Sequence, residues 1–191
     1  MVISDEYIKR GGDMNVQKET RNLVLSALFL AIAVIIQLLG KSIPQISQFL
    51  VGPVVNAVII LTTYFAGHKY GILVGALTPL LAYATNVLAP AMFPFVPFIA
   101  LGNIIYVITF SVFRSLKNKE VIGVMVGSVL KYLFLFYSAT KLIDIIAPGM
   151  KEPVKAKLAI AMGTPQLVTA LIGGGAAIIL YQLLKKRVKG I

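Results

Sequence analysis

Six long apolar stretches are the feature that most constrains how this chain can fold. They cover residues 22–40, 49–66, 70–89, 95–113, 121–146 and 159–184. A helix needs about 20 mostly apolar residues to cross the hydrocarbon core of a bilayer, and each stretch is close to that length or longer. Composition agrees, because 58% of the residues are hydrophobic and only 13% are charged. We therefore predict an all-α integral membrane protein, built as a single bundle of six transmembrane helices.

The connections between the stretches are too short to hold a second domain. The second and third stretches, for example, are joined only by Ala-Gly-His-Lys-Tyr-Gly at residues 66–71. We expect a polar N-terminal extension at residues 1–14 and one six-helix membrane domain at residues 15–191. The extension ends in Arg-Gly-Gly-Asp-Met, which a purine-rich run resembling a bacterial ribosome-binding site can encode. On this basis we predict that translation starts at Met14.

Basic residues mark one side of the expected bundle. The net charge is +11, and the surplus falls before the first stretch, between the second and third, after the fourth and after the sixth. Helices that alternate in direction bring these four segments to the same side, and the positive-inside rule assigns that side to the cytoplasm. We therefore expect both the N-terminus and the C-terminus in the cytoplasm. The surplus is interpreted as a topology signal, and we expect no nucleic-acid partner.

A lysine in the middle of the fifth stretch is the strongest candidate for a binding site. Lys131 lies ten residues beyond Val121, or about 15 Å along a helix, which is far for its ammonium group to reach the membrane surface. Ionisable groups at such depth are costly and usually face a cavity or a partner. No other stretch carries a carboxylate, and Asp144 has Lys141 as a nearer partner. Three explanations stay open: an anionic ligand, water and neutral groups such as Asn103, or loss of the proton by desolvation.

Polar side chains near the outer ends of the stretches supply further candidates. Prolines interrupt the same region, above all in the segment NVLAPAMFPFVPF, and leave backbone carbonyls that only non-lipid surroundings can satisfy. Each polar side chain, taken alone, could equally serve a helix cap or a hydrogen bond between helices. Together they favour a substrate-binding site in the outer half of the bundle. Its expected residues are Lys131, Asn103, Asn86, Tyr83, Gln166 and Gln48.

Small residues at four-residue spacing form a second pattern. Such residues let helices approach closely in lipid, where the hydrophobic effect does not drive association. The glycine series at 67–75 and 123–127 and the three glycines at 173–175 predict close packing within the bundle. Ala27 and Ala31, on the first stretch, fit either internal packing or an outward face that receives a partner helix.

Motifs of catalysis and of metal binding are missing from the sequence. There is no Gly-x-Ser-x-Gly elbow, no His-Glu-x-x-His pair and no phosphate-binding lysine loop. The chain has no cysteine and one histidine, which argues against thiolate or histidine metal sites. We expect no enzymatic activity, no metal and no cofactor. The missing nucleotide site also favours a binding subunit that takes its energy from another protein.

Several segments together are typical of one transporter family. They are ALFLA at residues 27–31, GPVVNAVIILTTYFAGHKYGILVGALTPLLA, FPFVPFIALGN, GSVLKYLFLFYS and PQLVTALIGG. Over about residues 15–190 the chain resembles a substrate-binding S component of an energy-coupling factor (ECF) vitamin transporter. The resemblance implies a multi-pass protein of the bacterial cytoplasmic membrane. It also implies that Ala27 and Ala31 pack on a transmembrane coupling subunit, which is itself bound to two ATPase subunits.

Two functions stay open from the sequence. The first is a high-affinity binding subunit for uptake of a small water-soluble vitamin or precursor, energised by a separate ECF ATPase module. The alternative is a self-sufficient small secondary carrier or channel for an organic anion. If Lys131 contacts the ligand, a carboxylate such as pantothenate, biotin, nicotinate or a folate is favoured.

Overall fold

Helices make up the regular structure of the chain. The computed structural model describes residues 2–42, 44–116 and 119–187, with side chains for residues 14–42, 50–116 and 119–187. Within these residues there is no strand, which confirms the predicted all-α class. The elements are α1 (Val2–Ser42), α2 (Pro44–Phe65), α3 (His68–Ala84), the 3₁₀ helix η1 (Pro90–Phe95), α4 (Val96–Ser115), α5 (Glu120–Tyr137), the π-helical turn η2 (Ser138–Leu142), α6 (Ile143–Ile146), α7 (Glu152–Ala161) and α8 (Thr164–Arg187).

Four of the helical segments are long and apolar enough to cross a membrane. In the described part of the chain they are Met14–Ser42, Pro90–Ser115, Glu120–Ile146 and Glu152–Arg187, and Leu50–Phe65 is a shorter apolar helix. These five segments correspond to five of the six apolar stretches in the sequence. The remaining stretch forms α3, which has 17 residues.

The helix α3 ends at Ala84, and the prediction that it extends to residue 89 is wrong. Asn86 has a φ of 55°, the left-handed conformation that commonly follows a helix C-terminus. The backbone N–H groups of Val87 and Leu88 turn back to the carbonyl oxygen of Ala82, at 2.8 and 3.0 Å. This turn satisfies the last carbonyls of α3 and directs the chain into η1.

The last apolar stretch is broken near its start, where the sequence predicted one continuous helix from residue 159. The helix α7 ends at Ala161, and α8 begins at Thr164. Gly163 lies in the break, and Pro165 occupies the first turn of α8, where its missing N–H group costs no hydrogen bond. The break lets α7 turn away from the direction of α8.

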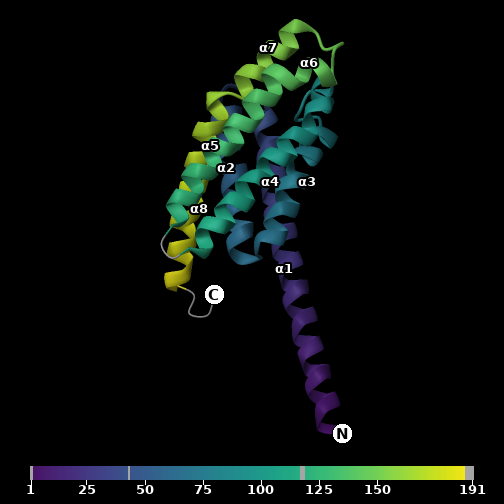
Figure 1. Ribbon diagram of the computed structural model, residues 1–191, viewed down its shortest axis with the longest axis vertical. Helices are drawn as coiled ribbons and strands as arrows, with labels where there is room; N and C mark the ends of the chain where they lie inside the picture. The colour runs from purple at the N-terminus through teal and green to yellow at the C-terminus, as the bar shows by residue number, and fades with distance from the viewer. Residues whose placement is uncertain (1, 43, 117–118, 188–191) are drawn as a thin grey trace.

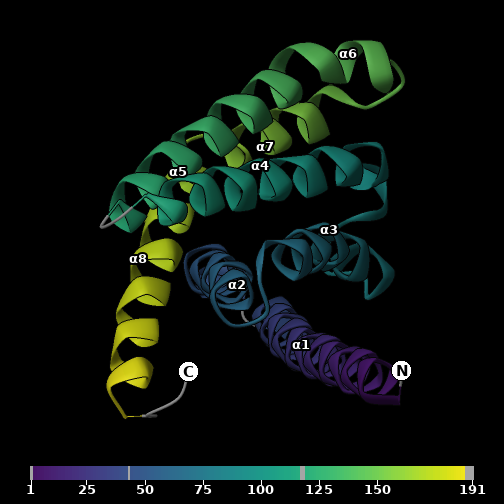
Figure 2. The ribbon, with the colours of Figure 1, turned by 60° about the horizontal axis from the view of Figure 1, so that its bottom comes forward.

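The six long helices form a ring. Following the contacts around it, α1 packs on α2, α2 on α8, α8 on α5, α5 on α4, α4 on α3, and α3 on α1. Figure 2 shows α2 near the centre of this arrangement, between α1, α3 and α8. These contacts bring together helices that lie far apart in the sequence, such as α2 and α8.

The two ends of the bundle differ in charge. The helix α1 begins and α8 ends at one end of the molecule, and α6 and α7 lie at the other end (Figure 1). The first half of α1 projects beyond the other helices (Figure 1). We call the first end the basic end, because it holds the described residues Lys18, Arg21, His68, Lys69, Arg114, Lys119, Lys185, Lys186 and Arg187.

The helix α8 approaches α2 and α4 most closely at two glycines. A Cβ atom on Gly173 would overlap the carbonyl oxygen of Pro53 and lie 2.7 Å from the Cβ atom of Asn56. A Cβ atom on Gly174 would overlap the hydroxyl group of Tyr106. The predicted close packing is therefore confirmed for these two glycines, whereas Gly175 has no neighbour within 4 Å of a Cβ position.

Candidate functional site

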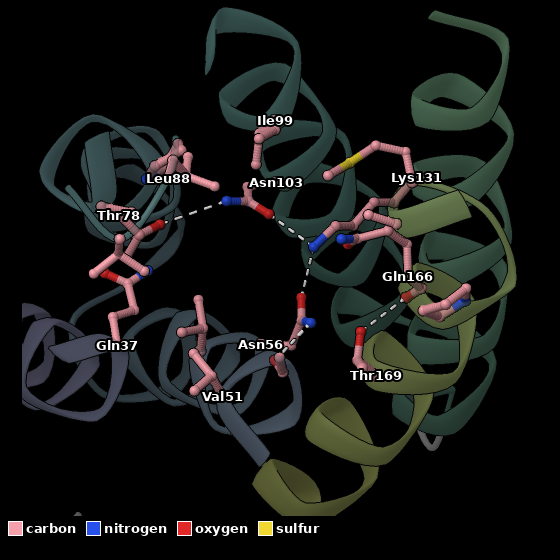
Figure 3. A pocket seen from close by; sticks show the side chains of 18 of the residues that line it. Gln37, Val51, Asn56, Thr78, Leu88, Ile99, Asn103, Lys131, Gln166 and Thr169 are labelled. Atoms are coloured by element: carbon pink, nitrogen blue, oxygen red, sulfur yellow. Dashed lines mark hydrogen bonds between the residues drawn. The ribbon is translucent and has the colours of Figure 1, made fainter. Parts of the chain in front are cut away.

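Lys131 is buried in α5 and contacts two amide side chains from other helices. Its exposed fraction is 3%, and among the side chains that the structure describes it is the only charged one that is buried. The Nζ atom donates to Oδ1 of Asn56 on α2 at 2.7 Å and to Oδ1 of Asn103 on α4 at 2.8 Å (Figure 3). The ring centroid of Tyr106 lies 5.6 Å from the same Nζ atom. We call Lys131, Asn56 and Asn103 the polar cluster.

The backbone fixes both asparagines in the orientation that Lys131 needs. Nδ2 of Asn56 donates to the carbonyl oxygen of Gly52 at 2.9 Å, and Nδ2 of Asn103 donates to that of Gly75 at 2.8 Å. Because a carbonyl oxygen can only accept, each amide must direct its nitrogen toward the backbone and its oxygen toward the ammonium group. The polar cluster is therefore preorganised to hold a cation.

A cavity of about 330 Å³ lies beside the polar cluster. It is bounded by α1, α2, α3, α4, α5 and α8. Met92 in η1 and Ala161 at the end of α7 also line it, which places it in the half of the bundle away from the basic end. Its polar lining consists of Gln37, Asn56, Thr78, Asn103, Lys131, Gln166 and Thr169. Its larger apolar side chains are Val51, Val55, Leu88, Met92, Ile99 and Met162. The cavity is thus mostly apolar, with polar groups at a few positions, as is typical of small-molecule sites.

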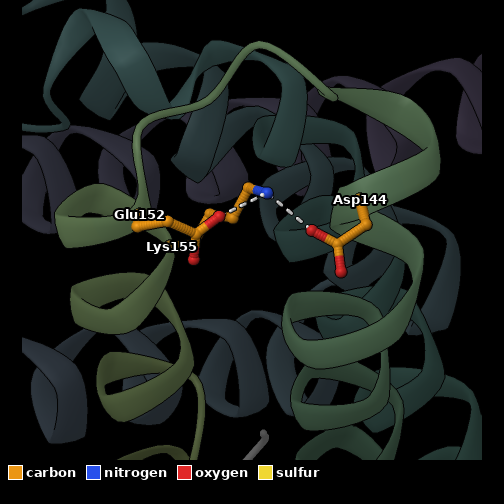
Figure 4. A network of polar contacts seen from close by, with 3 residues as sticks. All are labelled: Asp144, Glu152 and Lys155. Atoms are coloured by element: carbon orange, nitrogen blue, oxygen red, sulfur yellow. Dashed lines mark hydrogen bonds and ion pairs between the residues drawn. The ribbon is translucent and has the colours of Figure 1, made fainter.

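No carboxylate among the described residues lines this cavity. Asp144 and Glu152, the acidic residues at the α6–α7 end, both pair with Lys155 on α7, at 2.7 and 3.0 Å (Figure 4). The prediction that Asp144 pairs with Lys141 is wrong. Lys141 lies in the π-helical turn η2, whose wider turns remove the three-residue spacing of an α-helix, and α7 folds back to bring Lys155 across. The acids therefore leave Lys131 without a charged partner in the described part of the chain.

The structure brings three of the six predicted site residues to the cavity. Lys131, Asn103 and Gln166 line it. Asn86 is exposed in the turn after α3, and the ring of Tyr83 packs on Phe93, with ring centroids 4.9 Å apart. The side chain of Gln48 lies outside the part of the chain that the structure describes. A contact with ligand remains a prediction for all six residues.

Four polar lining residues were not among the predicted site residues. They are Gln37, Asn56, Thr78 and Thr169. Each is a polar residue within an apolar stretch, which is the signal that sequence offers. Gln37, on α1, is 7% exposed, and its Oε1 atom is buried without a hydrogen-bond partner among the described residues.

The outer face of α1 carries the two small residues that the sequence singled out. Ala27 and Ala31 are both exposed, so this pair does not pack within the bundle. Large apolar neighbours on the same helix are exposed as well, with fractions of 58% for Leu28 and 46% for Ile32. The structure therefore shows that the pair faces outward, and its contact with a partner helix remains a prediction.

A second polar cluster holds the helices together at the basic end. Tyr64 on α2 donates from its hydroxyl group to Oε2 of Glu120 at 2.8 Å. Arg114 donates to the backbone oxygen of Thr63 at 2.8 Å, and its guanidinium carbon lies 4.4 Å from the centroid of the Tyr64 ring. These contacts join α2 to both sides of the α4–α5 connection.

The fold and the site define a class of protein. A ring of apolar helices with a small, mostly apolar cavity lined by one buried lysine is typical of a membrane protein that binds a small molecule. A family model described as the ECF transporter, substrate-specific component, matches residues 21–184. The chain belongs to this family, as the resemblance in the sequence implied, and is a multi-pass membrane protein and a transporter subunit rather than an enzyme. No curated protein and no solved structure matches the chain.

Membership in this family also identifies the partners of the chain in general terms. A substrate-specific component of an ECF transporter has a small-molecule substrate and acts together with an ECF module of ATPases and a membrane coupling subunit.

Proposed function

We propose that this protein is the high-affinity binding subunit for uptake of a small water-soluble vitamin or precursor, and that a separate ECF ATPase module energises transport. The observation that carries the proposal is the cavity beside Lys131. The buried lysine uses two of its three ammonium donors within the protein, and apolar walls lie next to it. The chain that carries this cavity belongs to the substrate-specific family. Such a site is expected where a ligand supplies the charged partner that the protein lacks.

The proposed orientation places the basic end in the cytoplasm of a bacterial cell. Both chain ends then lie inside, by the positive-inside rule. The cavity lies in the opposite half of the bundle, so it faces the outer half of the cytoplasmic membrane. This position suits a protein that captures its ligand from outside.

The exposed face of α1 is the proposed contact with the coupling subunit. Small side chains at Ala27 and Ala31 allow another helix to approach the α1 backbone closely, and such contacts are an important source of affinity between helices in lipid. Because the face is apolar, it is also compatible with lipid when the subunit is free. We therefore infer a contact that can form and separate within the membrane.

Reconstitution tests the transport function. Vesicles that contain this protein alone should show no uptake of the ligand, and vesicles that also contain the coupling subunit and the two ATPases should show uptake that depends on ATP. Uptake by the protein alone would instead establish the alternative of a self-sufficient carrier or channel.

A double substitution tests the coupling face separately. Ala27→Leu with Ala31→Leu should leave ligand binding unchanged and abolish co-purification with the coupling subunit, because two isobutyl groups separate the helix backbones. Ala156→Leu makes the same change at an exposed position on α7 and should leave the complex intact. A normal complex with the double variant would remove this face from the interface.

A further inference from the structure

We infer that the ligand of the cavity is a compact organic acid with two functional ends: a carboxylate that meets Lys131, and an O–H or N–H donor that meets Gln37. This inference rests on the proposed binding function and adds the charge, polarity and orientation of the ligand. It follows from which hydrogen-bonding groups around the cavity are occupied and which are free.

The acid end follows from the state of Lys131. A lysine ammonium group has three donors, and Asn56 and Asn103 accept from two of them at 2.7 and 2.8 Å. Both acceptors are neutral, and no described carboxylate lines the cavity. A neutral carbonyl group could take the third donor, but it would leave the buried charge without a counter-charge, which is the larger cost. A carboxylate satisfies both requirements, through a charge-assisted hydrogen bond.

The donor end follows from Gln37, on the other side of the cavity. Figure 3 shows its side chain across the cavity from Lys131, beside Thr78. Its Oε1 atom is buried, and no side chain or backbone group in the described part of the chain forms a hydrogen bond with it. Thr78 cannot supply one, because its hydroxyl group donates to the carbonyl oxygen of Gly75 at 3.1 Å. Buried polar atoms are almost always paired in folded proteins, so the free oxygen indicates a donor on the ligand.

The walls between the two ends limit the rest of the ligand. Val51, Val55, Leu88 and Ile99 present apolar surface to the cavity. Its volume of about 330 Å³ is near the lower end of the range for ligand pockets. The ligand is therefore compact, and its middle carries few polar groups.

Matched pairs of compounds test the inference on the purified full-length protein. Pantothenate and biotin each combine a carboxylate with an O–H or N–H donor at the far end, whereas panthenol and biotinamide keep the far end and lose the negative charge. Nicotinate is a small acid without a far donor. At least one of the two donor-bearing acids should raise the melting temperature, and should bind about 100-fold more tightly than its neutral counterpart and about tenfold more tightly than nicotinate. Equal binding of acid and neutral compound would overturn the inference, and so would failure of both acids to bind.

Two variants separate the contributions of the ends. Lys131→Met should bring the affinity ratio of acid to neutral compound close to one, while Gln37→Leu should weaken the donor-bearing acid about tenfold and leave that ratio unchanged. Gln182→Leu repeats the second change at an exposed position of α8 and should change neither value. The melting temperature of each variant without ligand shows whether it folds. An unchanged ratio in Lys131→Met contradicts the acid end, and unchanged affinity in Gln37→Leu contradicts the donor end.

The outcomes also distinguish this inference from the proposed function. If uptake depends on the ATPase module but neutral compounds bind as well as acids, the protein is a binding subunit for another class of ligand, and only this inference fails. If acids bind selectively but uptake does not need the module, the ligand class holds and the proposed function fails.

Discussion

Replacing Gly173 by alanine should loosen the contact between α2 and α8 and weaken the ligand site with it. The added methyl group would overlap the carbonyl oxygen of Pro53 and lie 2.7 Å from Cβ of Asn56 and 2.9 Å from the backbone nitrogen of Ala57. Two of these three atoms belong to the backbone of α2, so the contact cannot be relieved by a change of rotamer. The two helices must move apart.

The expected size of the effect comes from two opposing terms. Alanine is more favourable than glycine in a helix interior by about 1 kcal/mol. Overpacking of a closely packed interior costs about 1–3 kcal/mol, and the backbone contacts at Gly173 place it in the upper part of that range. We expect a net loss of about 1–2 kcal/mol, which for a chain of this size lowers the melting temperature by about 2–8 °C.

Gly175→Ala is the matched control, because the same helix receives the same methyl group where no atom lies within 4 Å. Its melting temperature in detergent should equal or exceed that of the parent protein. Ligand affinity should fall only in Gly173→Ala, since movement of α2 shifts Asn56 away from Lys131. If the two variants melted at the same temperature and bound ligand equally, the close approach would not stabilise the bundle, and the reasoning would be refuted.

Other contacts lead to further expectations. Lys131→Met should remove the preference for acids yet change the melting temperature by only a few degrees, because the loss of a buried charge offsets the two acceptors left unpaired; loss of the folded protein in a thermal scan would contradict this balance. Tyr64→Phe removes the hydrogen bond to Glu120 and keeps the ring, so a loss of about 1 kcal/mol is expected in unfolding measurements; unchanged stability would show that the bond adds nothing. Lys155→Met should speed amide hydrogen exchange in α7 (Glu152–Ala161) without lowering the main melting transition, and exchange at the parent rate would mean that the ion pair does not hold α7.

The sequence predicted the elements of the bundle better than it predicted where they end. Apolar length alone is enough to identify a helix in a membrane protein, because few other structures satisfy the backbone there. The ends depend on single residues that apolar length does not weigh. Asn86 stops α3 by adopting a positive φ, and Gly163 with Pro165 divides the last stretch, although hydropathy continues across the break.

The polar cluster shows what one sequence can and cannot say about a site. The depth of Lys131 predicted a buried lysine that needs partners, and the structure shows this side chain buried and hydrogen-bonded to two amides. Its partner Asn56 is 75 positions away in the chain, on a helix whose rotation only the packed bundle determines. Gln37 was missed for the same reason, because nothing in its local sequence distinguishes it from other glutamines near helix ends.

A prediction from helical periodicity was also wrong, at a place where the helix is irregular. The pairing of Asp144 with Lys141 assumed an α-helix across both residues, and η2 replaces one turn of it by a π-helical turn. The actual partner, Lys155, comes from a helix that exists as a separate element only because the chain breaks after it. Ala139 in η2 and Met162 at the break after α7 belong to the same apolar cluster.

The attachment of both asparagines to the main chain has an evolutionary consequence. If either amide rotated, its nitrogen would lose the hydrogen bond to the backbone carbonyl of Gly52 or Gly75, so the lysine and its two acceptors form a unit that tolerates little variation. The hydrocarbon side chains opposite, such as Leu88 and Met92, bear no such constraint. Proteins descended from a common ancestor could therefore keep one recognition unit and diversify their substrates by resizing the wall around it.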